Sequence, residues 1–493
     1  MALIEYKLPD INNITCGVVK CYLYHDDTIT GLVYPSKVPF LNIGEFTESI
    51  DIEAGVVDVE NVKLDIREDY STYSEGFWWK LINGYPTLDV QIMFTVMEGT
   101  DETFLFRGSI YRDNVNFGEP YLDGLSVVRS CSIQLVSMIG AIDLVSTDDL
   151  IAECLFRSTM IHDSAVGDEY FVQLRSIFAC IVKLAFGVPY SLDLALNFSQ
   201  DIWGSYDGYT YLQWSSLWMK ATIGNPLTST YGYMGGASTY GWRNTYGTAK
   251  SLMQHLCLEF GVVPYYMFGT TSGLIDINPA NNGHRIILRA RGNRNTSTNI
   301  LILTGKIIKS DFVSSTPRRT GNIRYVFSEN SNHSDWFWKN IYHYGASYPS
   351  DVQFDIDVNT DFGINEPSLS DTLNTTRLLY TGAQPMESRE TVSRWMWHKY
   401  STGQDIEGIM ALRTAMTQYL YYCFSRSRFE FTRIYTSLKA DNGSMISQRT
   451  IQCLTSTDIT FLLNGVSTTK TFYASEVKKD IVNNKLTVIW VQA

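Results

Sequence analysis

The sequence predicts a β-rich α+β protein with two barrel-like antiparallel β-domains, packed helices and loop-rich insertions. Apolar residues at positions 90, 92, 94 and 96 alternate with other residues, which is typical of a strand with one buried face. After Ser146 the spacing of apolar residues becomes helical. From position 428 the chain returns to short alternating segments that turns separate. Together these patterns indicate strand-rich domains joined by helices.

The first β-domain is predicted from a hairpin and a third strand. "EGTDET" is a polar turn, "FLFRGSIYR" is the return strand, and Gly108 is a candidate bulge or point of close approach. In the third strand Val127 and positions 131, 133 and 135 share one face, on which Arg129 is the exception. Before the hairpin, alternation slips at Asn61, which predicts a bulge there. "GFWWKLINGY" predicts a short helix that ends at Gly84.

Helix-capping residues mark the predicted helices. "STDDLIAECLF" begins with hydroxyl and acidic residues, and a second helix is expected from Asp168 to Gly187. Thr248 is expected to cap a third helix that ends at Gly261, after which "VVPYYMF" and "GLIDI" predict two strands joined by a turn. A fourth helix is expected between positions 405 and 424.

These elements predict seven regions in chain order. They are an N-terminal arm (1–44), a first barrel-like β-domain (45–145), a helical connector (146–202), an aromatic-rich insertion (203–246), the first part of a second β-domain (247–327), a second insertion (328–404), and a helix with C-terminal strands that complete the second β-domain (405–493).

Length, charge and cysteine usage exclude several classes of protein. The 493 residues suggest about two to four domains. A formal net charge of -12 argues against an extended nucleic-acid-binding surface. The N-terminal residues do not resemble a signal peptide, and no apolar run could span a bilayer, so we expect a chain without a membrane anchor that begins in the cytosol. The eight cysteines contain no Cys-x-x-Cys pair and are interpreted as reduced core residues.

The sequence contains no recognisable catalytic motif. The seven histidines form no metal-binding pattern, and "GWRNTYGTAKS" lacks the lysine that follows the last glycine of a phosphate loop. We therefore expect a non-enzymatic protein without catalytic, metal-binding or cofactor-binding residues. A pair of carboxylates for sugar hydrolysis stays open, because such partners can lie far apart in sequence.

Arginines gather in and after the segment "HRIILRAR". Arg285, Arg289 and Arg291 share one face of the predicted strand, and Arg318 and Arg319 follow. Such a row could face DNA in a channel, because guanidinium groups bind phosphate well. The favoured interpretation is a contact with an acidic neighbouring subunit.

Aromatic residues are concentrated between positions 203 and 246, where eleven of 44 residues are aromatic. Tyrosine and tryptophan supply large contact areas with a polar tip, so this insertion could bind sugar rings or a protein. The favoured interpretation is packing on the protein's own domain or on a neighbouring subunit. The candidate partner-binding residues are Trp203, Tyr209, Trp214, Trp218, Tyr240 and Trp242.

The order of elements resembles that of the hub proteins of bacteriophage tail tips and baseplates. The resemblance rests on "FRGSIYRD…LSVVRSCSIQLVSMIGAIDL", on "AKSLMQHLCLEFGVVPYYMFG" with the hairpin after it, and on the strand-rich C-terminal end. It covers about 45–145, 245–330 and 405–493, whereas neither insertion has a counterpart in that family.

The resemblance implies a homotrimeric ring that joins the sixfold tail tube to a central spike or tail fibre and lines the DNA channel. It also implies contacts with a distal tail or tube protein ring and with a tape-measure protein, in a virion tail assembled in the host cytoplasm. DNA would be met only as it passes through the channel. The alternative is a carbohydrate-binding or glycan-hydrolysing host-adhesion protein that uses the insertion at 203–246.

Overall fold

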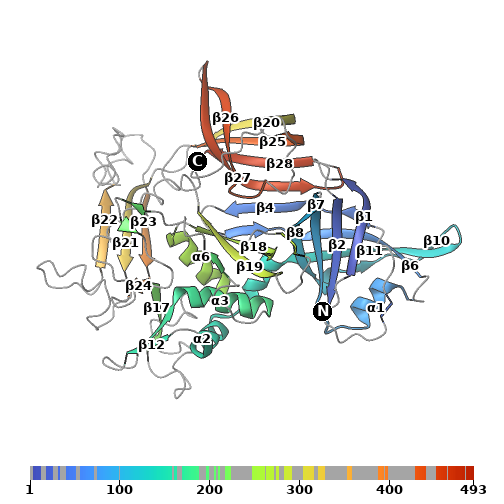
Figure 1. Cartoon of the computed structure of the whole chain (residues 1–493), viewed down its shortest axis with the longest axis horizontal. Coiled ribbons are helices and arrows are strands. Elements are labelled where there is room, and N and C mark those ends of the chain that lie inside the picture. Colours follow the sequence, from blue (N-terminus) through green and yellow to red (C-terminus); the bar gives the residue numbers. More distant parts are fainter. Residues whose placement is uncertain are drawn as a thin grey trace, which may run out of the picture.

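Two large antiparallel sheets and a set of helices form the body of the protein (Figure 1). The structure is a computed structural model. It describes residues 4–12, 18–25, 32–33, 40–51, 56–70, 75–98, 100–157, 160–163, 169–187, 196–198, 205–206, 209–210, 217–223, 247–260, 262–270, 274–276, 282–290, 304–315, 320–327, 352–357, 387–393, 395–397, 428–439, 451–463, 465–483 and 485–492. These residues confirm the predicted β-rich α+β class.

The first sheet has nine strands. Its order is β1 (Ile4–Asn12), β2 (Val18–His25), β7 (Val90–Glu98), β8 (Asp101–Ile110), β11 (Ser126–Ser137), β6 (Val62–Asp69) and β3 (Phe40–Ile43), with β9 (Asn116–Phe117) and β10 (Tyr121–Asp123) also paired to β11. Apolar side chains from β2 and β7 and from β6 and β11 belong to one buried cluster. Because strands far apart in the sheet share this core, the sheet curls around it.

Helix α1 (Phe77–Asn83) closes part of this core. Phe77, Trp78, Leu81 and Ile82 are buried in the same cluster as the strands. The helix ends where predicted, since Gly84 N–H bonds to Lys80 O at 2.9 Å. In the 3-10 turn η1 (Arg112–Asn114), which follows β8, the Arg112 guanidinium donates to the carbonyls of Ile82, Tyr85 and Leu88. This cation binds the Ile82 carbonyl at the end of the helix and two carbonyls of the segment that follows the helix.

The second sheet combines C-terminal strands with a hairpin from the N-terminal part of the chain. Its order is β20 (Thr304–Ser315), β25 (Arg428–Lys439), β28 (Lys485–Gln492), β27 (Val466–Asp480), β4 (Phe46–Asp51) and β5 (Val56–Val59), with β26 (Ser456–Leu463) paired to β27. The chain therefore leaves the first sheet after β3, forms two strands of the second sheet, and returns at β6.

The bulge predicted near Asn61 is wrong, and this crossing explains the pattern that suggested it. Val59 ends β5 in the second sheet, and Val62 begins β6 in the first. The alternation slips because the chain changes sheets between them. Strand pairing also crosses the boundary proposed at residue 45, because β1 and β2 belong to the first sheet and β4 to the second. The division into seven regions stays a prediction.

The central hairpin and its third strand are confirmed, with two differences in detail. Strand β7 pairs with β8, and the register shifts between Phe94 and Thr95, which makes Leu105 the bulged residue instead of Gly108. Gly108 is a point of close approach, because a Cβ there would lie 2.6 Å from Val136 O. On β11, Val127 is exposed and therefore does not share the buried face that was predicted for it.

The helices agree with their predicted caps more often than with their predicted lengths. Ser146 Oγ accepts a bond from Asp149 N at 3.1 Å at the start of α2 (Thr147–Arg157), and Thr248 Oγ1 accepts one from Ser251 N at 3.3 Å at α6 (Ala249–Phe260). Helix α3 (Leu174–Phe186) ends at Gly187 as predicted but begins later, because 169–173 form a strand. Asp168, Gly261 and the helix predicted at 405–424 lie outside the described residues.

A three-stranded sheet packs beside the first large sheet. It contains β14 (Leu196–Phe198), β19 (Gly283–Ala290) and β18 (Val262–Gly269), and β18 pairs antiparallel with β19. The return strand predicted at "GLIDI" is therefore wrong. Leu274 instead forms a bridge with Thr103, and Ile275 N donates to Glu102 O at 2.7 Å, so this segment lies against the first sheet.

The smaller sheets take in parts of both predicted insertions. One contains β12 (Met160–Asp163), β13 (Glu169–Gln173), β17 (Leu217–Ile223) and β24 (Trp395–Trp397); another contains β22 (Val352–Asp357), β21 (Thr320–Phe327) and β23 (Glu387–Ser393); the last contains β15 (Ser205–Tyr206) and β16 (Tyr209–Thr210). Strand β17 of the first insertion thus pairs with β24 of the second.

Five cysteines that the structure describes confirm the predicted core thiols. Cys21, Cys131, Cys154, Cys180 and Cys453 are buried thiols that form no disulfide. Within the described part of the chain, no helix combines the length and the apolar character that crossing a bilayer requires.

Replacing Gly108 with alanine should destabilise the first sheet. The new Cβ would meet Val136 O, which belongs to the paired backbone of β11 and has little freedom to move. Overpacking of this kind should lower the free energy of unfolding by about 1 to 3 kcal/mol. Urea denaturation measures the change. Gly283→Ala is the matched control, since nothing lies within 4 Å of a Cβ there, and an equal loss in both variants would contradict the steric explanation.

Candidate functional site

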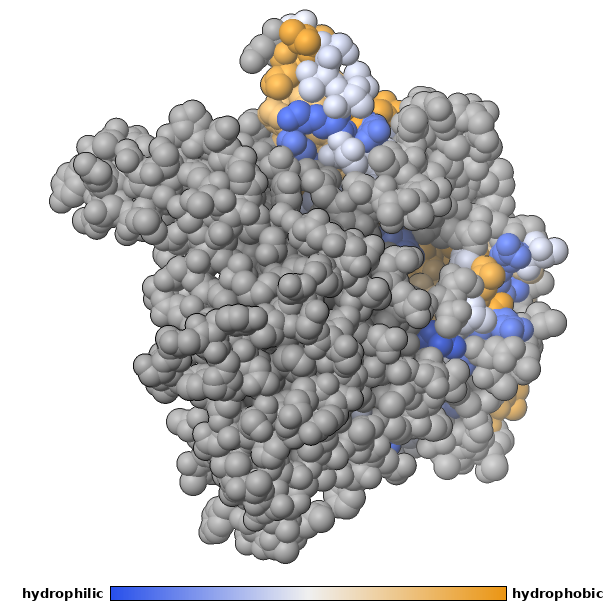
Figure 2. Space-filling model, turned by 60° about the vertical axis from the view of Figure 1, so that its left-hand side comes forward, coloured by the Kyte–Doolittle hydropathy of each residue, from blue (hydrophilic) through white to orange (hydrophobic). Residues whose placement is uncertain are grey.

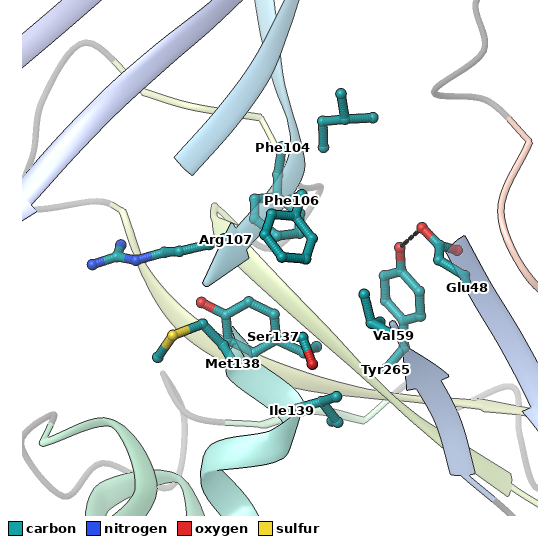
Figure 3. A pocket seen from close by; sticks show the side chains of 11 residues that line it. Glu48, Val59, Phe104, Phe106, Arg107, Ser137, Met138, Ile139 and Tyr265 are labelled. Atoms are coloured by element: carbon teal, nitrogen blue, oxygen red, sulfur yellow. Dashed lines mark hydrogen bonds between the residues drawn. The ribbon is translucent and has the colours of Figure 1, made fainter. Parts of the chain in front are cut away.

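A small cavity lies at the junction of the two large sheets and β18 (Figure 3). Its volume is about 20 Å³, which is room for about one water molecule. The lining combines aromatic and aliphatic side chains with three polar ones, and it comes from β4, β5, β8, β18, the end of β11 and the 3-10 turn η2 (Met138–Leu144). These residues include Glu48, Val59, Phe104, Arg107, Ser137, Met138, Ile139, Tyr265 and Tyr266.

Glu48 is the polar residue that connects the elements of this junction. Only 5% of its surface is exposed, and its Oε1 accepts bonds from Tyr265 OH at 3.0 Å and Lys479 Nζ at 3.4 Å. Its Oε2 accepts one from Cys453 N at 3.3 Å. Lys479 is itself 2% exposed, so the two charges form a buried ion pair. The carboxylate thereby ties β4 to β18, to β27 and to the segment before β26.

The alternation of β4 explains how Glu48 reaches this position. Phe46 and Glu48 are two residues apart and lie on the same face of the strand. The Phe46 ring packs on Phe94 at 5.2 Å and on Phe106 at 5.3 Å between ring centroids. This contact inserts β4 of the second sheet into the core of the first, and it directs the next side chain on that face, Glu48, toward Tyr265.

Arg107 on β8 is a buried cation without a carboxylate partner among the described residues. Its exposed fraction is 1%, and its guanidinium carbon lies 4.1 Å from the ring centroid of Tyr24 and 4.4 Å from that of Phe268. Nε donates to Gln91 Oε1 at 2.8 Å, whereas both terminal nitrogens are buried and have no hydrogen-bond partner. Burial lowers the pKa of Arg107, and it raises the pKa of Tyr24 to about 12. Cation–π contacts with the two rings and the hydrogen bond to Gln91 stabilise this charge.

His284 on β19 completes the aromatic layer over the first sheet. Its Nδ1 lies 2.9 Å from Tyr266 OH, and its ring stacks on Phe186 with centroids 5.1 Å apart. Burial, followed by the nearby Arg107 charge, holds the pKa of His284 well below its ordinary value. The imidazole is therefore neutral, and it serves as a packing and hydrogen-bonding group.

The chemistry of this junction is that of a structural connection. The Glu48 carboxylate accepts hydrogen bonds from donors in three segments, and Tyr266 and His284 are hydrogen-bonded to each other. Among the described residues, no group of three or more His, Cys, Asp or Glu side chains could hold a metal ion. The arrangement positions secondary-structure elements relative to one another.

The predicted arginine row is only partly described, and its role stays a prediction. Arg285 is buried, its Nε donates to Gly269 O at 2.8 Å, and burial lowers its pKa. Arg289 lies on β19 opposite Val263 in the backbone register. Arg291, Arg318 and Arg319 lie outside the described residues. Since His284 and Ile286 are also buried, this part of β19 is covered on both faces.

The predicted aromatic set also stays untested as a binding surface. Tyr209 lies on β16 and Trp218 on β17, where only the backbone is described. Trp203, Trp214, Tyr240 and Trp242 lie outside the described residues.

Sequence reasoning missed both Glu48 and Arg107. Each sits in a short strand pattern as an ordinary polar residue, "FTESID" and "FLFRGSI". The available signal was strand periodicity. Glu48 comes two residues after Phe46, and Arg107 two residues after Leu105, so each charge falls on a face that also carries an apolar residue. A charge on a predicted apolar face is a reason to look for a buried partner, and among these strands only Arg129 stood out as such an exception in the sequence.

Two hairpins project from the body and expose apolar side chains (Figures 1 and 2). On the β10–β11 hairpin Leu122 is 74% exposed and Leu125 is fully exposed; on the β26–β27 hairpin Leu462 is 74% and Val466 is 65% exposed. Figure 2 shows apolar residues along one side of the hairpin at the top of the molecule. We call these two hairpins the projecting hairpins.

Comparisons with known proteins give similarities of low score. No protein-family model matches the chain, and no curated protein sequence matches it. Similar solved structures include a 43 kDa tail protein of prophage MuSo2 from Shewanella oneidensis (TM-score 0.39, 10% identity, covering 96% of this chain and 98% of that one). Another is the prophage tail protein gp18 from Listeria monocytogenes EGD-e (TM-score 0.35, 10% identity, covering 90% of this chain and 87% of that one). A third is a tail protein from Neisseria meningitidis MC58 (TM-score 0.34, 10% identity, covering 92% of this chain and 97% of that one). TM-scores of this size assign neither fold nor function.

Replacing Arg107 with methionine should stabilise the protein. Methionine fills similar space between Tyr24 and Phe268 without a buried charge and without two unpaired donor groups, so the free energy of unfolding should rise by about 1 to 3 kcal/mol. Denaturant unfolding measures it.

Arg129→Met is the matched control for this prediction. Arg129 is also a buried arginine, but it forms an ion pair with the buried carboxylate of Glu68. Its removal should cost about 3 to 5 kcal/mol, because a buried charge is left alone. A loss of stability in Arg107→Met similar to that in the control would show that Arg107 has partners in the folded protein.

Stability should decline below the ordinary pKa of histidine, in part because of His284. Its folded-state pKa is lowered, so below about pH 6.5 the unfolded chain binds a proton that the folded chain does not. The contribution is fully present above that pH and is lost as pH falls. His284→Gln keeps an acceptor for Tyr266, and its change in unfolding free energy between about pH 7.5 and 5.5 should be smaller than that of the unmodified protein by about 1 kcal/mol. Equal changes in urea titrations of the two proteins would exclude a neutral His284.

Proposed function

We propose that this chain is a non-enzymatic structural protein of a bacteriophage tail tip or baseplate that forms the hub ring. The observation that carries the proposal is the pair of projecting hairpins, which expose apolar side chains at two separate places on the molecule. Contiguous apolar surface rimmed by polar residues is characteristic of sites that bind other proteins. The resemblance in element order to hub proteins gives this binding surface a biological setting.

The form of the β26–β27 hairpin supports an assembly role. Residues 466–471 of β27 pair with β26, whereas the pairing with β28 begins at Phe472. The outer part is thus a two-stranded ribbon, and such a ribbon is only marginally stable in water by itself. Val466 pairs with Leu463 and Leu462 with Ser467, so Leu462 and Val466 lie on opposite faces of the ribbon. A partner that encloses the ribbon would bury both and stabilise it.

The architecture of the chain supports a ring built from few copies. Each chain contributes two large antiparallel sheets, and β4 holds them together. Three copies would present six related β-units to a sixfold tail tube, which is an economical way to match the two symmetries. In this proposal the ring binds a distal tail or tube protein ring, the tape-measure protein and a central spike or tail fibre, and DNA passes through its channel.

Polar substitutions on the projecting hairpins should weaken assembly without unfolding the subunit. Burial of one leucine or valine contributes about 1.5 to 3 kcal/mol, so Leu462→Ser with Val466→Thr should raise the dissociation constant of the ring at least tenfold. Mass photometry should show trimers for the unmodified protein and mostly monomers for the variant at the same concentration. The melting temperature should be unchanged.

Leu144→Ser is the matched control, because Leu144 is an exposed leucine at the end of η2 and belongs to neither projecting hairpin. It should assemble like the unmodified protein. A hexamer, a stable monomer at micromolar concentration, or assembly that the hairpin substitutions leave intact would refute the proposed ring.

A further inference from the structure

One face of the β26–β27 hairpin continues into an aromatic patch of the second sheet. Val466 is paired with Leu463, so both lie on that face of the ribbon. Strand alternation places Phe461 and Lys470 on it as well. The Phe461 ring lies 5.8 Å from the ring of Phe312 on β20, which is 46% exposed. We call Phe312, Phe461, Val466 and Lys470 the receiving face.

The charges at the receiving face are positive. Lys470 Nζ lies 5.0 Å from the ring centroid of Phe429, and the guanidinium carbon of Arg433 lies 5.1 Å from that of Phe431. Lys470 is the only charged residue between positions 459 and 472. Its contact with the Phe429 ring leaves the ammonium group without a carboxylate partner among the described residues. The face therefore combines exposed apolar surface with a cation that an acidic partner would complement.

The tip of the β10–β11 hairpin has the complementary character. Leu122 is 74% exposed and Leu125 is fully exposed. Glu119 and Asp123 are the only charged residues between positions 116 and 128, and both are exposed. Asp123 is paired with an arginine of β6, whereas Glu119 has no ion pair within the described part of the chain. We call Glu119, Leu122, Asp123 and Leu125 the acidic tip.

We infer that the acidic tip of one copy of this chain docks on the receiving face of the next copy. In this contact the two leucines of the tip lie against the phenylalanine rings, and Glu119 lies beside Lys470. The inference rests on the proposed function and names the partner of both projecting hairpins within the ring.

Charge selects this arrangement over contacts between identical surfaces. Two receiving faces brought together would oppose lysine to lysine, and two tips would oppose acid to acid. Tip and face carry opposite charges, so the favourable contact joins two different surfaces. A contact of this kind is head-to-tail, and its repetition can close a ring.

The positions of the two surfaces fit a contact between copies. The β10–β11 hairpin extends from the first sheet and the β26–β27 hairpin from the second, on different sides of the molecule (Figure 1). The tip therefore does not cover the receiving face of its own chain. Leu462 lies on the opposite face of the ribbon and is open to a second contact, as enclosure of the ribbon requires.

The test is reversal of charge in the full-length chain. Lys470→Glu and Glu119→Lys should each raise the dissociation constant of the ring at least about tenfold, because each brings like charges together. A chain with both substitutions again has opposite charges at every contact, so its dissociation constant should return to within about threefold of the original value. Mass photometry at an ionic strength of about 50 mM measures these constants, because salt screens exposed charges.

Lys63→Glu is the matched control. Lys63 is an exposed lysine on β6, with 67% of its side chain accessible, and it belongs to neither surface. Its reversal should leave assembly unchanged and should not rescue Glu119→Lys. All of the substituted side chains are at least partly accessible to solvent, so the melting temperatures of the variants should match that of the unmodified protein.

Mixing two defective variants tests the direction of the contact. Leu122→Ser with Leu125→Ser removes the tip, and Val466→Thr with Lys470→Glu removes the receiving face. Each variant alone should be monomeric, and an equimolar mixture should form dimers without trimers, because only one contact can be made. Failure of the double reversal to restore assembly, or trimers that the tip substitutions leave intact, would overturn the inference while the ring itself survives. An unmodified chain that stays monomeric at micromolar concentration would refute both.

Discussion

The bonds of the Glu48 carboxylate determine how the parts of this protein fit together. A buried carboxylate without partners would be strongly destabilising, and here Lys479, Tyr265 and Cys453 N supply its hydrogen bonds. These donors belong to three segments that are distant in sequence, and each can be placed correctly only if the other two are. The same strand brings Phe46 into the core of the first sheet. The position of the second sheet and of β18 relative to the first therefore depends on β4.

Local signals predicted individual elements well, because caps and alternation act over a few residues. Ser146, Thr248, Gly84 and Gly187 each mark a helix end in the structure as they did in the sequence. Strand partners were harder to predict, since alternation reports a buried face and says nothing about which strand lies alongside. At Asn61 the slip of alternation was real, but a bulge and a change of sheet give the same local pattern.

The polar interior was the least predictable part of the site. Alternation on β19 suggested an arginine face opposite an apolar face, yet His284, Arg285 and Ile286 are all buried. Arg285 is covered because its side chain bonds to Gly269 O of the neighbouring strand, and His284 because Phe186 stacks on it. Arg107 is held between two rings that come from β2 and β18. Such environments depend on segments distant in sequence, so period-two patterns cannot reveal them.

The two projecting hairpins are continuous with the cores that they leave. Strand β27 begins at Val466 in the ribbon and continues to Val477, Lys479 and the Glu48 junction. Strand β11 likewise runs from exposed Val127 to Cys131, Ile133 and Leu135 in the first core. A strand fixed along half its length by core packing limits the orientations of its free half, which lowers the entropy lost on binding.

A force applied at either hairpin tip would also pass along covalent backbone to the buried contacts that join the two sheets. If the chain docks on other subunits as proposed, strands shared between the projecting hairpins and the cores would let it respond to load as one body.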